Sequence, residues 1–271
     1  MTQKEPGQSR LHVGDELRVL SVPGVPGIEE GDSLDAIVTE CLAEAGIELL
    51  EADVIVLASK VVSRAEGCFV DLSQVVPSEE AAALAREVDK DPQLVELILR
   101  DSAGISRKRE GALIVRHRLG FVSANAGIDA SNSAPADAAQ GTGPWVLTLP
   151  RDPNATAAAL RAHLEKAAGV KLGVVITDSW GRPFRRGTVG FALGSSGLPP
   201  VSDRRGDRDR HGRELEFTET ATADAVAAAA DLAAGQANEG RPLTLVRGLR
   251  FEPSDDDSRA LQRDPEQDLY A

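Results

Sequence analysis

The chain has 271 residues, 42% of them hydrophobic, which suits one large globular domain or two closely packed ones and excludes wholesale disorder. Its formal net charge of −13 excludes a general affinity for nucleic acid, because phosphate contacts would have to overcome long-range repulsion. No apolar run is long enough for a membrane span and the polar start is unlike a signal peptide, so we expect no membrane contact and a cytoplasmic location.

The first part of the chain predicts a strand, a loop rich in Pro and Gly, and a helix. Residues 16–22 alternate in polarity and predict a strand that runs into PGVPGI at 23–28. This segment is either a plain turn, which the composition favours, or a loop that reads a nucleotide through main-chain groups. Asp32 and Ser33 are good helix caps and predict a helix over 33–46.

A second strand is predicted over 53–58, where an apolar run ends in cations. Lys60 and Arg64 follow this strand, and each has a serine beside it. Phosphate binding explains these residues, and a solvated basic turn explains them equally well.

The middle of the chain predicts surface helices, two short strands and a tight bend. Residues 77–109 are charged and rich in Ala and Leu at helical spacing, which predicts one or two helices. Strands are predicted over 112–116 and 120–124, and the second leads into NAGIDASN at 125–132. Oxygen ligands that converge around Asp129 suit a divalent cation, although an Asx-rich turn has the same composition.

The stretch VVITDSWGRPFRRG at 174–187 is the strongest candidate for chemistry. Its β-branched run predicts a buried strand that ends at Asp178 and Ser179, followed by three arginines. A carboxylate and a hydroxyl at a strand end can hold Mg²⁺ or Mn²⁺, and the arginines can face phosphate. An alternative interpretation, about equally well supported, is a strand that leaves the core through a polar turn whose arginines are solvated. Two strand-end carboxylates, Asp129 and Asp178, are what a nucleotide–metal site requires.

The rest of the chain predicts alternating strands and helices joined by polar loops. Between residues 182 and 213 there are eight arginines and three acidic residues, which predicts a cationic pocket for a small polyanion. Residues 1–12 and 252–271 are expected to be flexible termini. The other predicted elements are a flexible loop at 133–143, strands at 145–149, 190–194 and 243–246, and helices at 155–168 and 219–234.

Five ordered blocks resemble the coenzyme F420-0:L-glutamate ligase family over about residues 17–250. The blocks are VPGVP at 22–26 with GDSL at 31–34, ASKVVSRAEG at 58–67, NAGIDASN at 125–132, ITDS at 176–179 with GRPFRRG at 181–187, and GREL at 212–215. Neither a Walker A motif nor GxGxxG is present. The resemblance implies the α+β class, with the mixed α/β two-lobed fold of the F420:gamma-glutamyl ligase type and no P-loop or Rossmann core. It places the ligase domain, as one unit or two intimate subdomains, over 13–250, without the nitroreductase-like domain fused to some bacterial members.

The resemblance also implies an activity. A member of this family is a GTP-dependent acid–amino-acid ligase that adds L-glutamate to coenzyme F420-0 through an acyl phosphate and extends a gamma-linked oligoglutamate tail, in coenzyme F420 biosynthesis. Two Mg²⁺ or Mn²⁺ ions per site, K⁺ as a further cation and a homodimer are implied with it. Two alternatives stay open, namely a ligase of the same fold with a different carboxylate acceptor and a non-catalytic GTP-binding module.

Individual roles carry over from the family's motifs. The implied metal ligands are Asp129, Asp178, Ser179 and Gln236. The implied catalytic residues are Asp129, Asp178 and Arg186. The implied GTP contacts are Val25, Pro26, Gly27, Ile28, Ser59, Arg64 and Asn132. Three of these positions depart from the usual pattern, because Ser179 stands where threonine is usual, Arg64 where lysine is usual, and Gln236 where an acidic ligand can stand.

Overall fold

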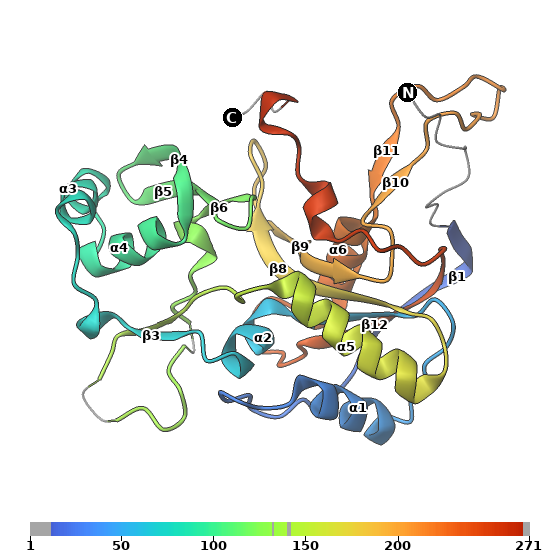
Figure 1. The fold of residues 1–271 in the computed structure, drawn as a ribbon, viewed down its shortest axis with the longest axis horizontal. Coiled ribbons are helices and arrows are strands. Elements are labelled where there is room, and N and C mark those ends of the chain that lie inside the picture. The colour runs from blue at the N-terminus through green and yellow to red at the C-terminus, as the bar shows by residue number, and fades with distance from the viewer. Residues whose placement is uncertain (1–11, 132, 140–141, 268–271) are drawn as a thin grey trace.

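A five-stranded mixed sheet forms the centre of the fold, in the order β1-β12-β2-β8-β9 (Figure 1). The structure is a computed structural model that describes residues 12–131, 133–139 and 142–267. Strands β2 and β8 are parallel, and the other neighbouring pairs are antiparallel. The strands are β1 (His12–Ser21), β2 (Val54–Ala58), β8 (Gly173–Gly181), β9 (Thr188–Ser196) and β12 (Leu243–Arg250).

The two parallel strands are buried on both faces, as their runs of β-branched residues predict. Residues 54–57 of β2 and 173–176 of β8 are all buried. Their pairing ends at Ala58 and Thr177, but β8 continues to Gly181 because it pairs there with β9. Asp178 therefore lies inside β8, just past the end of the parallel pairing, and not at the strand end where the sequence placed it.

Helices cover both faces of this sheet. On one face, α1 (Leu34–Glu44), α2 (Ser59–Ala65) and α5 (Pro153–Ala168) pack on the core. On the other face lies α6 (Thr222–Ala234), and a Cβ at Gly190 of β9 would come within 2.5 Å of a carbonyl oxygen of α6. The predicted helices over 33–46 and 155–168 are confirmed. Of the two interpretations of the residues after 58, the solvated basic turn is not formed, since α2 begins there directly.

A smaller lobe has its own sheet and its own core (Figure 1). In it, α3 (Glu79–Val88) and α4 (Pro92–Arg100) pack on a three-stranded sheet. The strands of this sheet are β4 (Ser102–Arg109), β5 (Ala112–His117) and β6 (Val122–Ala124). The helical prediction is therefore wrong for 102–109, because these residues pair with β5 along their length. The α+β class and the two lobes expected from the sequence are confirmed.

Short elements link the lobes and extend from them. Two further strand pairs are β3 (Phe69–Asp71) with β7 (Trp145–Leu147), and β10 (Val201–Asp203) with β11 (Glu219–Ala221). The second pair continues into an arm that stands away from the main body (Figure 1). Four 3-10 helices complete the described elements: η1 (Leu72–Gln74), η2 (Asn125–Gly127), η3 (Ser258–Leu261) and η4 (Pro265–Gln267).

The C-terminal segment packs against the main lobe over the part that the structure describes. Ser258 is buried, and its hydroxyl donates to the carbonyl of Leu193 in β9 at 2.9 Å. Gln262 donates to the carbonyl of Leu119 in the smaller lobe at 2.6 Å. Residues 252–267 thus differ from the flexible tail that their acidic composition predicted, because tertiary contacts hold them in place.

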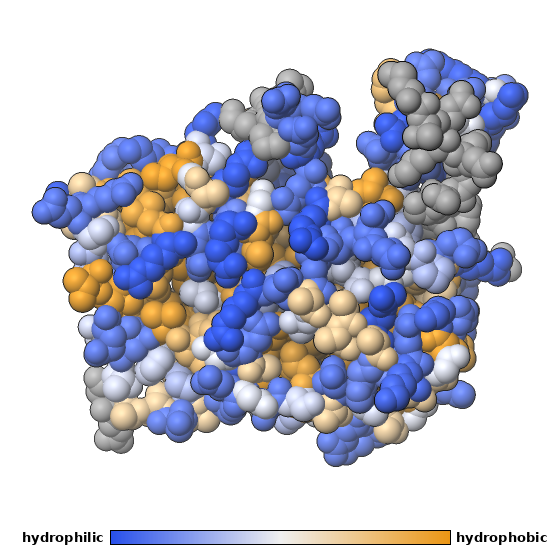
Figure 2. All heavy atoms as spheres, viewed as in Figure 1, coloured by the Kyte–Doolittle hydropathy of each residue, from blue (hydrophilic) through white to orange (hydrophobic). Residues whose placement is uncertain are grey.

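Hydrophilic side chains cover much of the face seen in Figure 2, with apolar side chains showing over the smaller lobe. None of the helices in the described part of the chain has the length and apolar run that a membrane crossing requires.

Candidate active site

A cavity of about 820 Å³ opens beyond the end of β2 and is walled by segments far apart in the sequence. The loop before α1, the start of α2, the bend after η2, the middle of β8 and the loop after α6 all contribute. The carboxyl end of a parallel strand pair is where α/β proteins place ligands, since the ladder stops there and leaves room. Nine of the sequence-predicted site residues line this cavity: Pro26, Gly27, Ile28, Ser59, Arg64, Asp129, Asp178, Ser179 and Gln236.

Asp129 is anchored by a lysine and a serine. Its Oδ2 forms an ion pair with Lys60 Nζ at 2.8 Å. Its Oδ1 accepts hydrogen bonds from both the backbone N–H and the hydroxyl of Ser131, each at 2.7 Å. Burial works to raise the pKa of Asp129, but the Lys60 ammonium and the Ser131 donors outweigh it and hold the pKa below its ordinary value. This carboxylate is therefore charged and oriented before any ligand arrives.

Asp178 has the opposite environment. Burial raises the pKa of Asp178 to about 6, the N–H of Ser179 works against that rise, and the nearby charge of Asp129 adds to it. Its Oδ1 accepts from the Ser179 N–H at 2.7 Å. A carboxylate that is half-buried beside a second carboxylate gains most from a cation, because a positive charge relieves both burial and repulsion.

A chain of polar groups continues from β8 to α6. The Ser179 hydroxyl donates to Oε1 of Gln236 at 2.7 Å, and the amide of Gln236 donates to Asp231 near the end of α6. Asp231 and Glu239 also line the cavity. The sequence reasoning missed both acids, because Asp231 lies inside an Ala-rich helix and Glu239 in the polar loop after it, and neither follows a strand.

The loop before α1 is fastened to the cavity by Arg64. The guanidinium donates to the carbonyl of Ile28 at 2.6 Å and to Glu29 at 2.6 Å, and it lies 5.0 Å from the centre of the Phe69 ring. In this geometry Arg64 holds the loop against α2. Lys60, which pairs with Asp129, and Arg241 are the other cations that line the cavity.

Three predicted residues are not placed in the cavity. Val25 packs beside the main core, next to the cavity-lining Pro26. Arg186 is exposed in the turn between β8 and β9. Asn132 lies outside the described residues.

The arginines between residues 182 and 213, which predicted a cationic pocket, do not contribute to the active-site cavity. All eight arginines of this stretch lie in the described part of the chain, and none lines the cavity. Two of them pair with acids of the arm instead, Arg204 with Asp207 at 2.6 Å and Arg205 with Asp203 at 2.6 Å.

The oxygen atoms that these side chains offer suit a hard divalent cation whose remaining ligands come from a substrate. Two carboxylates, a hydroxyl and an amide offer oxygen, which Mg²⁺ and Mn²⁺ prefer. Within the described ranges there is no group of three or more His, Cys, Asp or Glu side chains that could hold a metal by itself. This matches the way Mg²⁺ binds in phosphoryl-transfer sites, where one or two carboxylates act together with substrate phosphates and water.

The fold and the cavity define an α+β protein that collects oxygen ligands and cations where a parallel strand pair ends. Its central sheet has neither the P-loop motif nor the Rossmann fingerprint. The chain belongs to the F420-0:Gamma-glutamyl ligase family, whose model matches residues 24–248. The resemblance indicated by the five sequence blocks is thereby confirmed.

Curated relatives match almost the whole chain. It is 44% identical to the Coenzyme F420:L-glutamate ligase of Methanopyrus kandleri over 259 residues, which cover 94% of this chain and 97% of that protein. It is 42% identical to the protein of the same name from Methanothermobacter thermautotrophicus over 256 residues, covering 94% and 98%. The corresponding protein of Haloarcula marismortui is 39% identical over 259 residues, covering 93% and 95%.

Proposed function

We propose that this protein is a GTP-dependent ligase that joins L-glutamate to coenzyme F420-0 and then extends a gamma-linked glutamate tail. The observation that carries this proposal is the meeting of Asp129 and Asp178 in one cavity with Lys60 and the loop at residues 26–28. Family membership supports the reaction type, and the names of the relatives support the acceptor and the amino acid.

The reaction needs an activated carboxylate, since a carboxylate and an amine do not form an amide unaided. In the proposed route, a carboxylate oxygen of the acceptor attacks the γ-phosphorus of GTP and GDP leaves. The amine of glutamate then attacks the acyl carbon of the resulting acyl phosphate, and the C–O bond to inorganic phosphate breaks. Catalysis of such a step depends mainly on positioning and on neutralising charge.

The residues of the cavity suit these tasks. Asp129, Asp178 and Ser179 would hold two Mg²⁺ or Mn²⁺ ions, which neutralise phosphate charge when bound. Lys60 keeps Asp129 ionised and fixed in place, and it also donates to the carbonyl and hydroxyl oxygens of Ser131, at 2.7 and 3.2 Å, so it holds the bend around Asp129 against α2. The Gln236 amide is a weak neutral ligand that orients the Ser179 hydroxyl, and K⁺ is a further candidate beside it.

The test is to incubate the purified protein with GTP, Mn²⁺, L-glutamate and coenzyme F420-0, and to measure product mass together with GDP and phosphate. We expect one glutamyl mass increment per GTP consumed, followed by further increments. Asp129→Asn and Asp178→Asn should each lower the rate at least roughly a hundredfold, since even residues outside the first ligand set cost about 10- to 100-fold.

Asp89→Asn is the matched control, because Asp89 ends α3 in a left-handed conformation that asparagine tolerates, outside the cavity. Asp89→Asn should leave the rate within about twofold of the wild type.

If the protein consumes GTP only with a different carboxylate acceptor, it is a ligase of the same fold that acts on that acceptor. GTP binding without any phosphate release, unchanged in Asp178→Asn, would indicate a non-catalytic module. The homodimer stays a prediction, for which the molar mass in solution is the test.

A further inference from the structure

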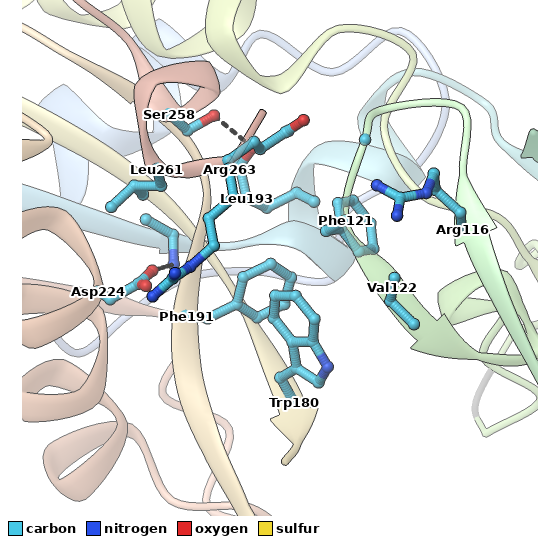
Figure 3. Close-up of a pocket in the computed structure, with 13 residues that line it drawn as sticks. Arg116, Phe121, Val122, Trp180, Phe191, Leu193, Asp224, Ser258, Leu261 and Arg263 are labelled. Carbon is cyan, nitrogen blue, oxygen red and sulfur yellow. Dashed lines mark hydrogen bonds between the residues drawn. The ribbon is translucent and has the colours of Figure 1, made fainter. Parts of the chain in front are cut away.

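A second pocket lies beside the active-site cavity, and it has a different chemistry. Its volume is about 280 Å³, and it is bounded by β8, β9, the smaller lobe and the C-terminal segment. Phe121, Trp180 and Phe191 form its wall, with edge-to-face contacts at centroid distances of 4.2 to 5.5 Å (Figure 3). Arg116 and Arg263 lie at opposite sides of these rings.

This gathering of rings is unusual for the chain. The whole sequence has six Phe, two Trp and one Tyr, so one third of its aromatic residues meet in this small pocket. By contrast, no aromatic side chain is found among the described residues that line the active-site cavity. A ligand with a planar ring therefore finds partners for stacking in the second pocket and not in the first.

Strand β8 joins the two spaces. Successive side chains of a strand alternate, so Asp178 and Trp180 lie on the same face about 7 Å apart. Asp178 also pairs directly with Phe191 across the β8–β9 ladder. A ligand whose ring occupies the aromatic pocket therefore needs only a short attached chain along β8 to reach the carboxylates of the active site.

We propose that the aromatic pocket binds the ring end of the acceptor, a planar heteroaromatic ring that carries an anionic chain. This inference rests on the proposed function, because the ring in question is that of the molecule that receives glutamate. The rings of Trp180, Phe121 and Phe191 supply stacking and edge contacts, and Arg116 and Arg263 attract the anionic chain. The acceptor then spans both pockets, while GTP and glutamate use the larger one.

The test measures KM for each substrate separately, together with the dissociation constant of coenzyme F420-0 by calorimetry without GTP. Trp180→Leu should weaken acceptor binding about tenfold or more, since stacking on an aromatic side chain contributes strongly to ring binding. Trp180→Phe should restore most of the affinity. The KM values for GTP and glutamate should stay within about twofold in both variants.

Two further variants separate this role from general damage to the fold. Trp145→Leu makes the same change at the other tryptophan, which lies on β7 outside the pocket, and should leave acceptor binding unchanged. Arg263→Gln alters an exposed side chain on the opposite wall, and it should weaken acceptor binding severalfold and reduce its salt dependence.

The outcomes distinguish the two proposals. If the wild type transfers no glutamate, the proposed function fails. If it is active but Trp180→Leu and Arg263→Gln both bind the acceptor normally, the aromatic pocket is not the acceptor site. An equal rise in the KM for GTP in Trp180→Leu, or the same loss in Trp145→Leu, would also overturn the inference.

Discussion

His117 should make the protein lose stability as pH falls from about 6.5 to about 4. Its ring is 1% exposed, stacks on Phe121 at 5.0 Å, and accepts a hydrogen bond from the Leu119 N–H at Nδ1, 3.0 Å away. Burial lowers the pKa of His117 from 6.5 to about 4, while the charge of Asp101 opposes this shift and Arg118 adds to it. A proton on Nδ1 would also remove the acceptor that the Leu119 N–H uses.

The sign and size of the effect follow from proton linkage. The unfolded chain binds a proton at His117 below pH 6.5, whereas the folded chain binds it only near pH 4. Between these values the unfolded state holds more protons than the folded state. The free energy of unfolding therefore decreases as the pH is lowered. At about 1.36 kcal/mol for each pKa unit, the full loss is roughly 3 kcal/mol.

The assay is urea unfolding at pH steps from about 7.5 to about 4, for the wild type and for His117→Asn. Asparagine cannot titrate here, and its side-chain oxygen can still accept from the Leu119 N–H. The stability difference between the two proteins should therefore shrink by about 3 kcal/mol as pH falls. His163→Asn makes the same change at an exposed side chain as a control. A wild-type-to-His117→Asn difference that stays constant with pH would refute the reasoning.

Two further predictions concern the main lobe. Gly190→Ala places a Cβ 2.5 Å from the carbonyl oxygen of Ala227 and should destabilise the protein by about 1–3 kcal/mol in thermal unfolding, whereas Gly181→Ala meets no atom within 4 Å and should be nearly neutral. Equal melting temperatures for these two variants would contradict the close packing of α6 on β9. Asp53→Asn removes a 1% exposed carboxylate that pairs with Arg247 at 2.6 Å, and should cost about 3 kcal/mol in urea unfolding. A loss below about 1 kcal/mol would show that water replaces this pair.

Much of the fold could be predicted from local patterns. The buried segments at residues 54–57 and 174–176 are apolar and mostly β-branched, and α5 begins where Asp152 caps its first turn and Pro153 fixes φ. What local patterns missed depends on distant partners. The segment Ser102–Arg109 is a strand because β5 pairs with it, and η3 is held through the buried Ser258.

The candidate site could be predicted only in part for the same reason. Asp129 and Asp178 stood out because each followed a predicted strand, and the structure brings them into one cavity. The Lys60–Asp129 ion pair and the contact of Ser179 with Gln236 join segments whose proximity no spacing in the sequence encodes. Arg186 was predicted to be catalytic from its motif, and its place in an exposed turn is decided by the geometry of the β8–β9 hairpin.

The second half of β8 constrains chain length as well as residue type. Asp178 and Trp180 share one face of the strand, and Ser179 turns to the other face toward Gln236. Inserting or deleting one residue just before Asp178 would exchange these faces, because the side-chain period of a strand is two. A change of residue type at position 179 that keeps a hydroxyl leaves both faces of the strand as they are, whereas a change of length here would turn Asp178 away from the cavity that Asp129 lines.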